Sequence, residues 1–498
     1  MNILKKNPNF DKIIGIGLFI LSIILLLVML ILGLNQALWN DETFTFQLIS
    51  MSFNNMLSAT AMDVHPPLYY IILMGIFKLF SPLFPTFNII FAKLISIVPL
   101  ILLIYFSFIN LRKELDWLTG GIFAFCIITM PKLMFYGVQV RMYSWVMFFV
   151  TLSFYYSYKI TKQSTKKNWI IFTIFCLLAA YTHYYGAFAV GIIYLMLLVY
   201  LILKNRVLVK NWVFSTIAII LCYIPWMNIF LHKSKYFDSQ QWYIPVSEEI
   251  TKSFGVLFSP TNIMYDYNLT NLGMLLFISV ILLIISYILF IIIKDRNYSF
   301  NFLGLGGVFV LIATMAFAWL FSIYVSPMLY ARYSFPMVGC LWLSVAVLLA
   351  KFYSKKMIFI PILTVILLVG IMNCVSFINY ETDLNSGDLE FRGYVNQIGE
   401  NDTIICLSSS FDVDFFKFYL NSTNFVVGWN TSSIHSDIEN KLKKGKIWVF
   451  DNWGKNTDGT KEFSNLLMEN GFKLDDVGEI KQTYGNYPHN IYLIKSSQ

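Results

Sequence analysis

Charged residues are scarce in this sequence. Asp, Glu, Lys and Arg make up 13% of its 498 residues, whereas soluble globular domains carry roughly 25%. Hydrophobic residues make up 57%. An ordinary globular fold cannot bury so much apolar material and still present a polar surface to water. The composition therefore excludes an ordinary soluble enzyme and predicts an integral membrane protein.

Cysteine pairs and nucleotide-binding loops are also lacking. The six cysteines include no CxxC pair, so we interpret them as packing residues and not as a disulfide framework. No GxGxxG or P-loop pattern occurs, and we expect no nucleotide cofactor. Acidic residues concentrate after residue 380 and leave the preceding part basic, so the net charge of +8 does not indicate a nucleic-acid partner.

Long apolar runs are what the sequence does contain. A helix that crosses a bilayer needs about 20 mainly apolar residues. The first run follows a basic start and lacks a small-x-small cleavage site, so we expect a retained membrane helix and not a signal peptide. The sequence predicts an α-helical polytopic membrane protein with about eleven transmembrane helices, at residues 12–34, 88–110, 117–134, 143–159, 168–182, 184–203, 212–231, 272–293, 303–325, 332–350 and 357–378.

The short apolar segment 66–80 decides which side each loop faces. If it does not cross, the N-terminus and the basic loops 111–116, 160–167, 204–211, 294–302 and 351–356 are cytoplasmic, as the positive-inside rule requires. We therefore expect 66–80 to be an interfacial helix on the outer face. The N-terminus is then cytoplasmic, and everything after residue 378 is extracytoplasmic.

The chain after the last span has the composition of a soluble domain. We divide the protein into a membrane domain, residues 1–379, and a soluble α/β domain, residues 380–498. Strand-like runs alternate with amphipathic helical patterns, which indicates a small α/β layer with a partly parallel sheet. We expect an accessory or acceptor-binding domain, with strands at 403–409, 424–428, 446–452 and 490–495 and helices at 411–420, 434–444 and 461–470.

Acidic residues and a histidine follow the first span. Asp41 and Glu42 lie directly outside it, and Asp63 and His65 come later in the same outer loop. Burial at an interface can raise the pKa of a carboxylate towards that of a useful base. The alternative is structural: the acidic pair caps a short surface helix, and the prolines after His65 begin a helix rigidly.

Two arginines and a second histidine belong to the same predicted face. Arg141 and Arg332 lie at outer ends of spans, and His183 lies at a turn between two spans. An arginine there either snorkels or binds an anion, and a pair suits a phosphate-bearing lipid. The loop 232–271 is charged, with an interfacial helix expected at 247–258. Two interpretations are open: it covers a site or receives a substrate, or it is a solvated connector, which is the default that we adopt.

Five motifs occur in order along the chain: DE after the first helix, HPPLYY, FYGVQVRMY, YTHYYGAF and SPMLYARYSFP. Together they resemble those of membrane glycosyltransferases of the GT-C fold. More narrowly, the chain resembles the prokaryotic branch related to dolichyl-phosphate-mannose protein mannosyltransferases and the aminoarabinose lipid A transferases. The resemblance covers about residues 10–380 and extends more loosely to the tail. Family members often have YSQEARMY where this chain has YGVQVRMY, so Val138 and Val140 replace polar or small residues.

The resemblance implies transfer of a sugar, mannose-like in the family, from a polyprenyl-phosphate donor to a lipid, glycan or protein acceptor at the outer face. It implies direct displacement with inversion, with Asp41 as base and Glu42 orienting the acceptor. Arg141 and Arg332 match positions near the donor phosphate. The glutamate of the family motif is missing, which leaves a divalent metal ion an open question. The remaining expected site residues are Asp63, His65, Tyr143, His183 and Tyr333.

The main alternative is a transporter or flippase of a lipid-linked substrate. It predicts ionisable residues near the centres of spans and interrupted helices at the midplane. Lys93 and Lys132 lie near predicted span ends, which gives this alternative little support. A third alternative is a membrane-anchored binding protein whose working part is the tail.

Overall fold

The computed structural model describes residues 8–34, 38, 40–63, 65–80, 88–233, 246–260, 268–294, 298–325, 328–407, 425–427, 434–451, 458–480 and 489–497. The chain forms two compact units. One comprises Met1–Ile31 and Met51–Phe377, and the other comprises Leu32–Ser50 and Ile378–Gln498.

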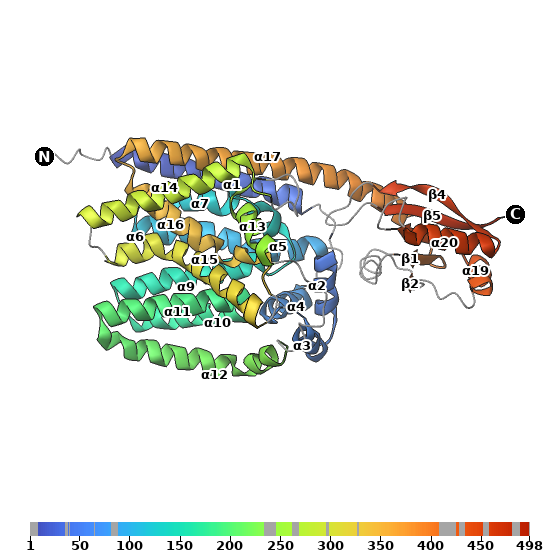
Figure 1. The fold of residues 1–498 in the computed structure, drawn as a ribbon, viewed down its shortest axis with the longest axis horizontal. Coiled ribbons are helices and arrows are strands. Elements are labelled where there is room, and N and C mark those ends of the chain that lie inside the picture. The colour runs from blue at the N-terminus through green and yellow to red at the C-terminus, as the bar shows by residue number, and fades with distance from the viewer. Residues whose placement is uncertain are drawn as a thin grey trace. The chain divides into compact units, whose positions relative to one another are not determined.

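The described elements of the first unit are all helices (Figure 1). The last of them, α17, begins in this unit and ends in the second. In chain order they are α1 (Pro8–Gly33), α3 (Phe53–Met62), α4 (Leu68–Phe80), α5 (Asn88–Phe106), the π-helix η1 (Ser107–Leu111), α6 (Arg112–Glu114), α7 (Trp117–Thr129), α8 (Leu133–Val138), α9 (Tyr143–Lys162), α10 (Lys166–Thr182), α11 (Tyr184–Lys204), the 3-10 turn η2 (Arg206–Leu208), α12 (Val209–Lys233), α13 (Val246–Phe258), α14 (Asn271–Lys294), α15 (Tyr298–Tyr324), the 3-10 helix η4 (Ala331–Met337), α16 (Val338–Lys351) and α17 (Lys356–Val395).

Eight described helices are long and apolar enough to cross a membrane, which confirms the predicted polytopic helical fold. All eleven predicted ranges contain a helix, but α7, α9 and α10 are not among the eight. α7 has only 13 residues. α9 is polar for a span, and its buried Thr151 and Ser153 donate to backbone carbonyls of the same helix, which satisfies their hydroxyls without water. Both helices are buried almost throughout, so their neighbours and not lipid surround them.

The first unit is built around α9. This helix contacts α5, α10, α11, α15 and α16, and Figure 1 shows α9 to α12 as neighbouring helices. α1 and α7 approach closely at Gly15 and Gly121, where a Cβ on either glycine would collide with the backbone of the other helix. Small residues let membrane helices approach in this way. The predicted helices at 66–80 and 247–258 are present as α4 and α13.

The second unit contains α2 (Asn40–Ser50), the end of α17 and a five-stranded sheet. The strand order is β2-β1-β3-β5-β4; β1 pairs in parallel with β2 and β3, and β5 pairs antiparallel with β3 and β4. The partly parallel sheet is therefore confirmed. The elements are β1 (Thr403–Cys406), β2 (Phe425–Val427), α19 (Ile434–Leu442), β3 (Ile447–Asp451), α20 (Asp458–Glu469), β4 (Phe472–Ile480) and β5 (His489–Ser496).

Apolar side chains cover both faces of this sheet. Ile405 and Val449 pack with Ile438 of α19 and Leu467 of α20 on one face. On the other face, Trp448 and its neighbours pack against residues at the end of α17. β4 was not predicted from the sequence, and the predicted helix at 411–420 lies outside the described residues. α17 runs without a break through the predicted domain boundary at residue 379, and that boundary stays a prediction.

Candidate functional site

His183 is the single extended residue between α10 and α11, with φ −158° and ψ 140°. Its N–H donates to the Ala179 carbonyl at 3.2 Å, and its own carbonyl accepts from the N–H of Ala187 at 3.1 Å. The side chain caps α11, because Nδ1 accepts from the N–H of Tyr185 at 3.0 Å. A neutral imidazole whose Nδ1 accepts carries its proton on Nε2. The backbone therefore selects the tautomer of His183.

Gly186 allows this turn to close. A Cβ at residue 186 would lie 2.6 Å from the carbonyl oxygen of Ala179 and 2.7 Å from Cγ2 of Val146. Only glycine fits so close an approach without displacement of backbone. The glycine of the YTHYYGAF motif thus has a packing role next to the histidine.

Three rings from distant parts of the chain meet at His183. Ring centroids of His65 and Tyr333 lie 4.8 Å and 4.9 Å from that of His183, and Tyr143 lies at 6.3 Å. They come from the segment before α4, from η4 and from the start of α9. We call His65, Tyr143, His183 and Tyr333 the His183 cluster. The sequence predicted only that these four residues share the outer face of the membrane, and the structure brings their rings together.

Two arginines affect the protonation of His183. Burial, together with the positive charges of Arg141 and Arg332, lowers the pKa of His183 to about 3. Arg141 is 4% exposed and precedes α9. Arg332 lies on η4, with its Cζ 4.8 Å from the ring centroid of Tyr330. Among the described residues, the buried Nε2 of His183 has no hydrogen-bond partner. Two guanidiniums and one imidazole N–H are donors suited to an anion.

Asp63 and His65 lie between α3 and α4. Asp63 ends α3, and its Oδ2 accepts from the Tyr70 hydroxyl at 3.3 Å. His65 is 1% exposed. The helix begins directly after Pro67, whose carbonyl accepts from the N–H of Ile71 at 3.0 Å. Pro66 and Pro67 therefore do precede the start of a helix, as predicted. His65, next to them in the chain, contacts the ring of His183.

Asp41 and Glu42 belong to the second unit, whereas the other predicted site residues belong to the first. Both lie in the first turn of α2, where the helix dipole favours negative charge. Glu42 is fully buried and Asp41 half-buried. The structural alternative expected a helix to start here, which α2 does, but it expected a surface helix, and Glu42 is buried. Their roles in catalysis stay predictions.

Glu249 is not among the predicted site residues. The loop 232–271 was interpreted as a solvated connector, yet Glu249 is 1% exposed and its Oε2 accepts from the N–H of Ala331 at 2.7 Å. No local pattern marked it, because a charged residue followed four positions later by a polar one is typical of a solvated face; in the structure Ser253 and Val256 are buried with it. Positions i, i+4 and i+7 share one helix face. The carboxylate lies on the buried face of α13.

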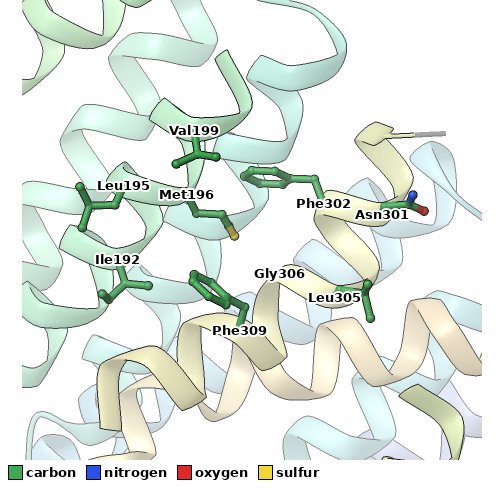
Figure 2. A pocket seen from close by; sticks show the side chains of 9 residues that line it. All are labelled: Ile192, Leu195, Met196, Val199, Asn301, Phe302, Leu305, Gly306 and Phe309. Atoms are coloured by element: carbon green, nitrogen blue, oxygen red, sulfur yellow. The ribbon is translucent and has the colours of Figure 1, made fainter. Parts of the chain in front are cut away.

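Two apolar cavities open within the first unit. One, of about 460 Å³, lies among α3, α4, α10 and α12, and Pro67, Tyr181 and Trp226 are among its lining residues. The other, of about 420 Å³, lies between α11 and α15. Figure 2 shows Phe302 and Phe309 pointing from α15 towards Met196 of α11. Such linings suit hydrocarbon chains.

Metal-ligating side chains do not gather in the part of the chain that the structure describes. No group of three or more His, Cys, Asp and Glu side chains that could hold an ion occurs among those residues. Protein zinc sites usually need three or four such ligands.

No protein-family model matches the chain, and no curated protein sequence matches it either. Its fold is similar to that of ArnT from Cupriavidus metallidurans, an aminoarabinose lipid A transferase. The apo structure of ArnT is 10% identical, with a TM-score of 0.55 over 96% of this chain and 98% of that one. The structure bound to undecaprenyl phosphate is 9% identical, with the same TM-score and the same coverage of both chains. This likeness confirms the predicted GT-C fold.

Proposed function

We propose that the protein transfers a sugar from a polyprenyl-phosphate-linked donor to an acceptor at the extracytoplasmic membrane face. One observation carries the proposal: a neutral, buried His183 presents an Nε2–H beside the positive charges of Arg141 and Arg332. The solved ArnT structure with bound undecaprenyl phosphate makes a lipid phosphate the natural candidate for the anion.

A phosphate monoanion or diester fits these donors by charge and by geometry. Guanidinium groups bind phosphate oxygens with two parallel N–H donors. A neutral imidazole adds a third donor without a third positive charge. Because the cluster is largely buried, these interactions are stronger than they would be in water. The same donors would stabilise the charge that grows on the phosphate as it leaves the sugar.

The reaction that follows is a direct displacement. An acceptor hydroxyl attacks the anomeric carbon on the face opposite the phosphate, the C–O bond to phosphate breaks, and the configuration inverts. Asp41 takes the hydroxyl proton, and polyprenyl phosphate leaves with its negative charge held by Arg141 and Arg332. Glu42 orients the acceptor. A positioned general base contributes about 10²–10⁴-fold in rate.

The family resemblance is the basis for the proposed sugar and acceptor. By that resemblance the sugar is a hexose, as in the mannosyltransferases, and the acceptor is a lipid, a glycan or a protein. The partners are therefore the lipid-linked donor, this acceptor and membrane lipids. The protein would be a multi-pass membrane protein with a cytoplasmic N-terminus and an extracytoplasmic C-terminal domain.

The test is transfer by membranes that contain the protein. Radiolabelled hexoses linked to undecaprenyl phosphate are supplied, and release of undecaprenyl phosphate and labelling of acceptors are followed. We expect Asp41→Asn to lower transfer at least about 100-fold, while Glu439→Gln on the surface of α19 leaves it unchanged. Full transfer by Asp41→Asn would show that Asp41 is not the base.

One observation favours transport as the second candidate. Lys93 and Lys132 are fully buried, and Lys132 occupies the break between α7 and α8 with a φ of 61°. Buried charge at an interrupted helix is typical of transporters. Movement of unchanged lipid-linked sugar across vesicle membranes, without any transfer, would favour this function over glycosyl transfer.

A further inference from the structure

Glu249 is a buried carboxylate outside the predicted site. It lies in the first turn of α13, where its neighbour Glu248 has a side chain that is 59% exposed. Glu249 itself is 1% exposed. Burial of a carboxylate is costly unless hydrogen bonds or charges compensate it. Its partners therefore indicate what it does.

The two carboxylate oxygens of Glu249 have different partners. Oε2 accepts from the N–H of Ala331 at 2.7 Å. Oε1 lies 3.2 Å from Nζ of Lys252, which also approaches Glu248 at 3.5 Å. Val256 of α13 packs against Ala331 in a small buried cluster. α13 is thus attached to Ala331 by one charge-assisted hydrogen bond and by apolar packing.

Ala331 is the first residue of η4, and the structure gives this helix no cap of its own. The preceding residue, Tyr330, is extended, and its side chain makes no capping hydrogen bond. An anionic acceptor at the first N–H of a helix satisfies that donor and is favoured by the helix dipole. Glu249 performs the capping from a different helix.

The segment that Glu249 caps carries site residues. Arg332 directly follows Ala331, and Tyr333 comes next, with its ring 4.9 Å from that of His183. Tyr333 is tied to the same turn, because its N–H donates to the Tyr330 carbonyl at 2.9 Å. A shift of residue 331 would therefore displace both side chains from the His183 cluster.

We infer that Glu249 is a positioning residue, which caps η4 and thereby holds Arg332 and Tyr333 at the His183 cluster. Its effect on substrate rests on the proposed function, in which Arg332 binds the donor phosphate. Its effect on η4 does not. The two effects can be measured separately.

Hydrogen–deuterium exchange of the full chain in detergent tests the structural half. We expect amides in the peptide 328–337 to exchange about tenfold faster in Glu249→Ala, because the bond to Ala331 is lost. Glu249→Gln keeps an acceptor oxygen at the same reach and should exchange like the wild type. Glu248→Ala is the matched control, because it removes an equal charge from the neighbouring position and should change nothing.

Binding of undecaprenyl phosphate tests the second half. We expect Glu249→Ala to weaken its Kd about tenfold, Glu249→Gln to restore it to within about threefold, and Glu248→Ala to match the wild type. If Glu249→Ala does not yield monodisperse protein, Glu249→Asp takes its place, because its carboxylate is one methylene short of Ala331.

The outcomes separate the two ideas. If Arg332→Ala leaves the Kd unchanged, the proposed function is wrong at this residue, while the exchange experiment still decides the role of Glu249 in η4. If Arg332→Ala weakens binding but Glu249→Ala does not, the inference is overturned. Unchanged exchange of 328–337 in Glu249→Ala would also overturn it, as would equal acceleration in Glu248→Ala.

Discussion

A fall in pH should destabilise the folded protein through His183. Its pKa is lowered from 6.5 to about 3 by burial and by the charges of Arg141 and Arg332. The unfolded chain therefore protonates this histidine at a pH where the folded protein does not. Between these two pKa values the unfolded state binds more protons, so the free energy of unfolding decreases as the pH falls. Above about pH 6.5 the histidine is neutral in both states and contributes no pH dependence.

The size of this effect follows from the shift. Each pH unit below the unfolded pKa costs about 1.4 kcal/mol. At about pH 5, some 1.5 units below it, the loss through His183 is about 2 kcal/mol relative to neutral pH. Solvent reduces the figure little, because His183 is 1% exposed.

The assay is thermal unfolding in detergent at about pH 7.5 and about pH 5. We expect the wild type to lose more stability between these conditions than His183→Gln, which has no group to protonate there. Parallel pH dependence of the wild type and His183→Gln would refute the assignment of a neutral, buried imidazole.

Three further predictions concern binding, packing and topology. Arg332→Lys loses the planar fork of donors and should weaken the Kd of undecaprenyl phosphate about tenfold; an unchanged Kd would contradict a bidentate contact. Gly186→Ala should lower the unfolding midpoint by the equivalent of about 1–3 kcal/mol, whereas Gly191→Ala on the same helix should not, because nothing lies within 4 Å of its added Cβ. A cysteine replacing Met62, which is 85% exposed, should react with a membrane-impermeant thiol reagent in intact cells, while one replacing Val207 should react only after lysis; the reverse pattern would invert the topology.

Local patterns in the sequence predict most helices because an apolar run of sufficient length decides both structure and membrane location. β4 was missed for an equally local reason. Its sequence FKLDDVGEI places Asp475 and Asp476 side by side, and the pairing with β5 is irregular between Asp476 and Gly478. A β-bulge breaks the alternation on which strand recognition depends. Charged residues on an edge strand also discourage pairing between molecules.

The candidate site could be predicted only in part. The motifs identified His65, His183 and Tyr333, and topology put them on one side. Their contact depends on how α10, α11 and η4 pack, which no local pattern contains. Glu249, in contrast, was not identified at all. A charged loop residue is usually solvated, and its partner, Ala331, is 82 residues away in the chain.

The central claim is that Arg141, Arg332 and His183 bind the phosphate of a lipid-linked donor. An electron cryomicroscopy structure of the full chain with undecaprenyl phosphate tests it most directly. We predict density for the phosphate within hydrogen-bond distance of both guanidiniums and of Nε2 of His183. Bound lipid whose phosphate lies away from all three side chains would contradict the claim.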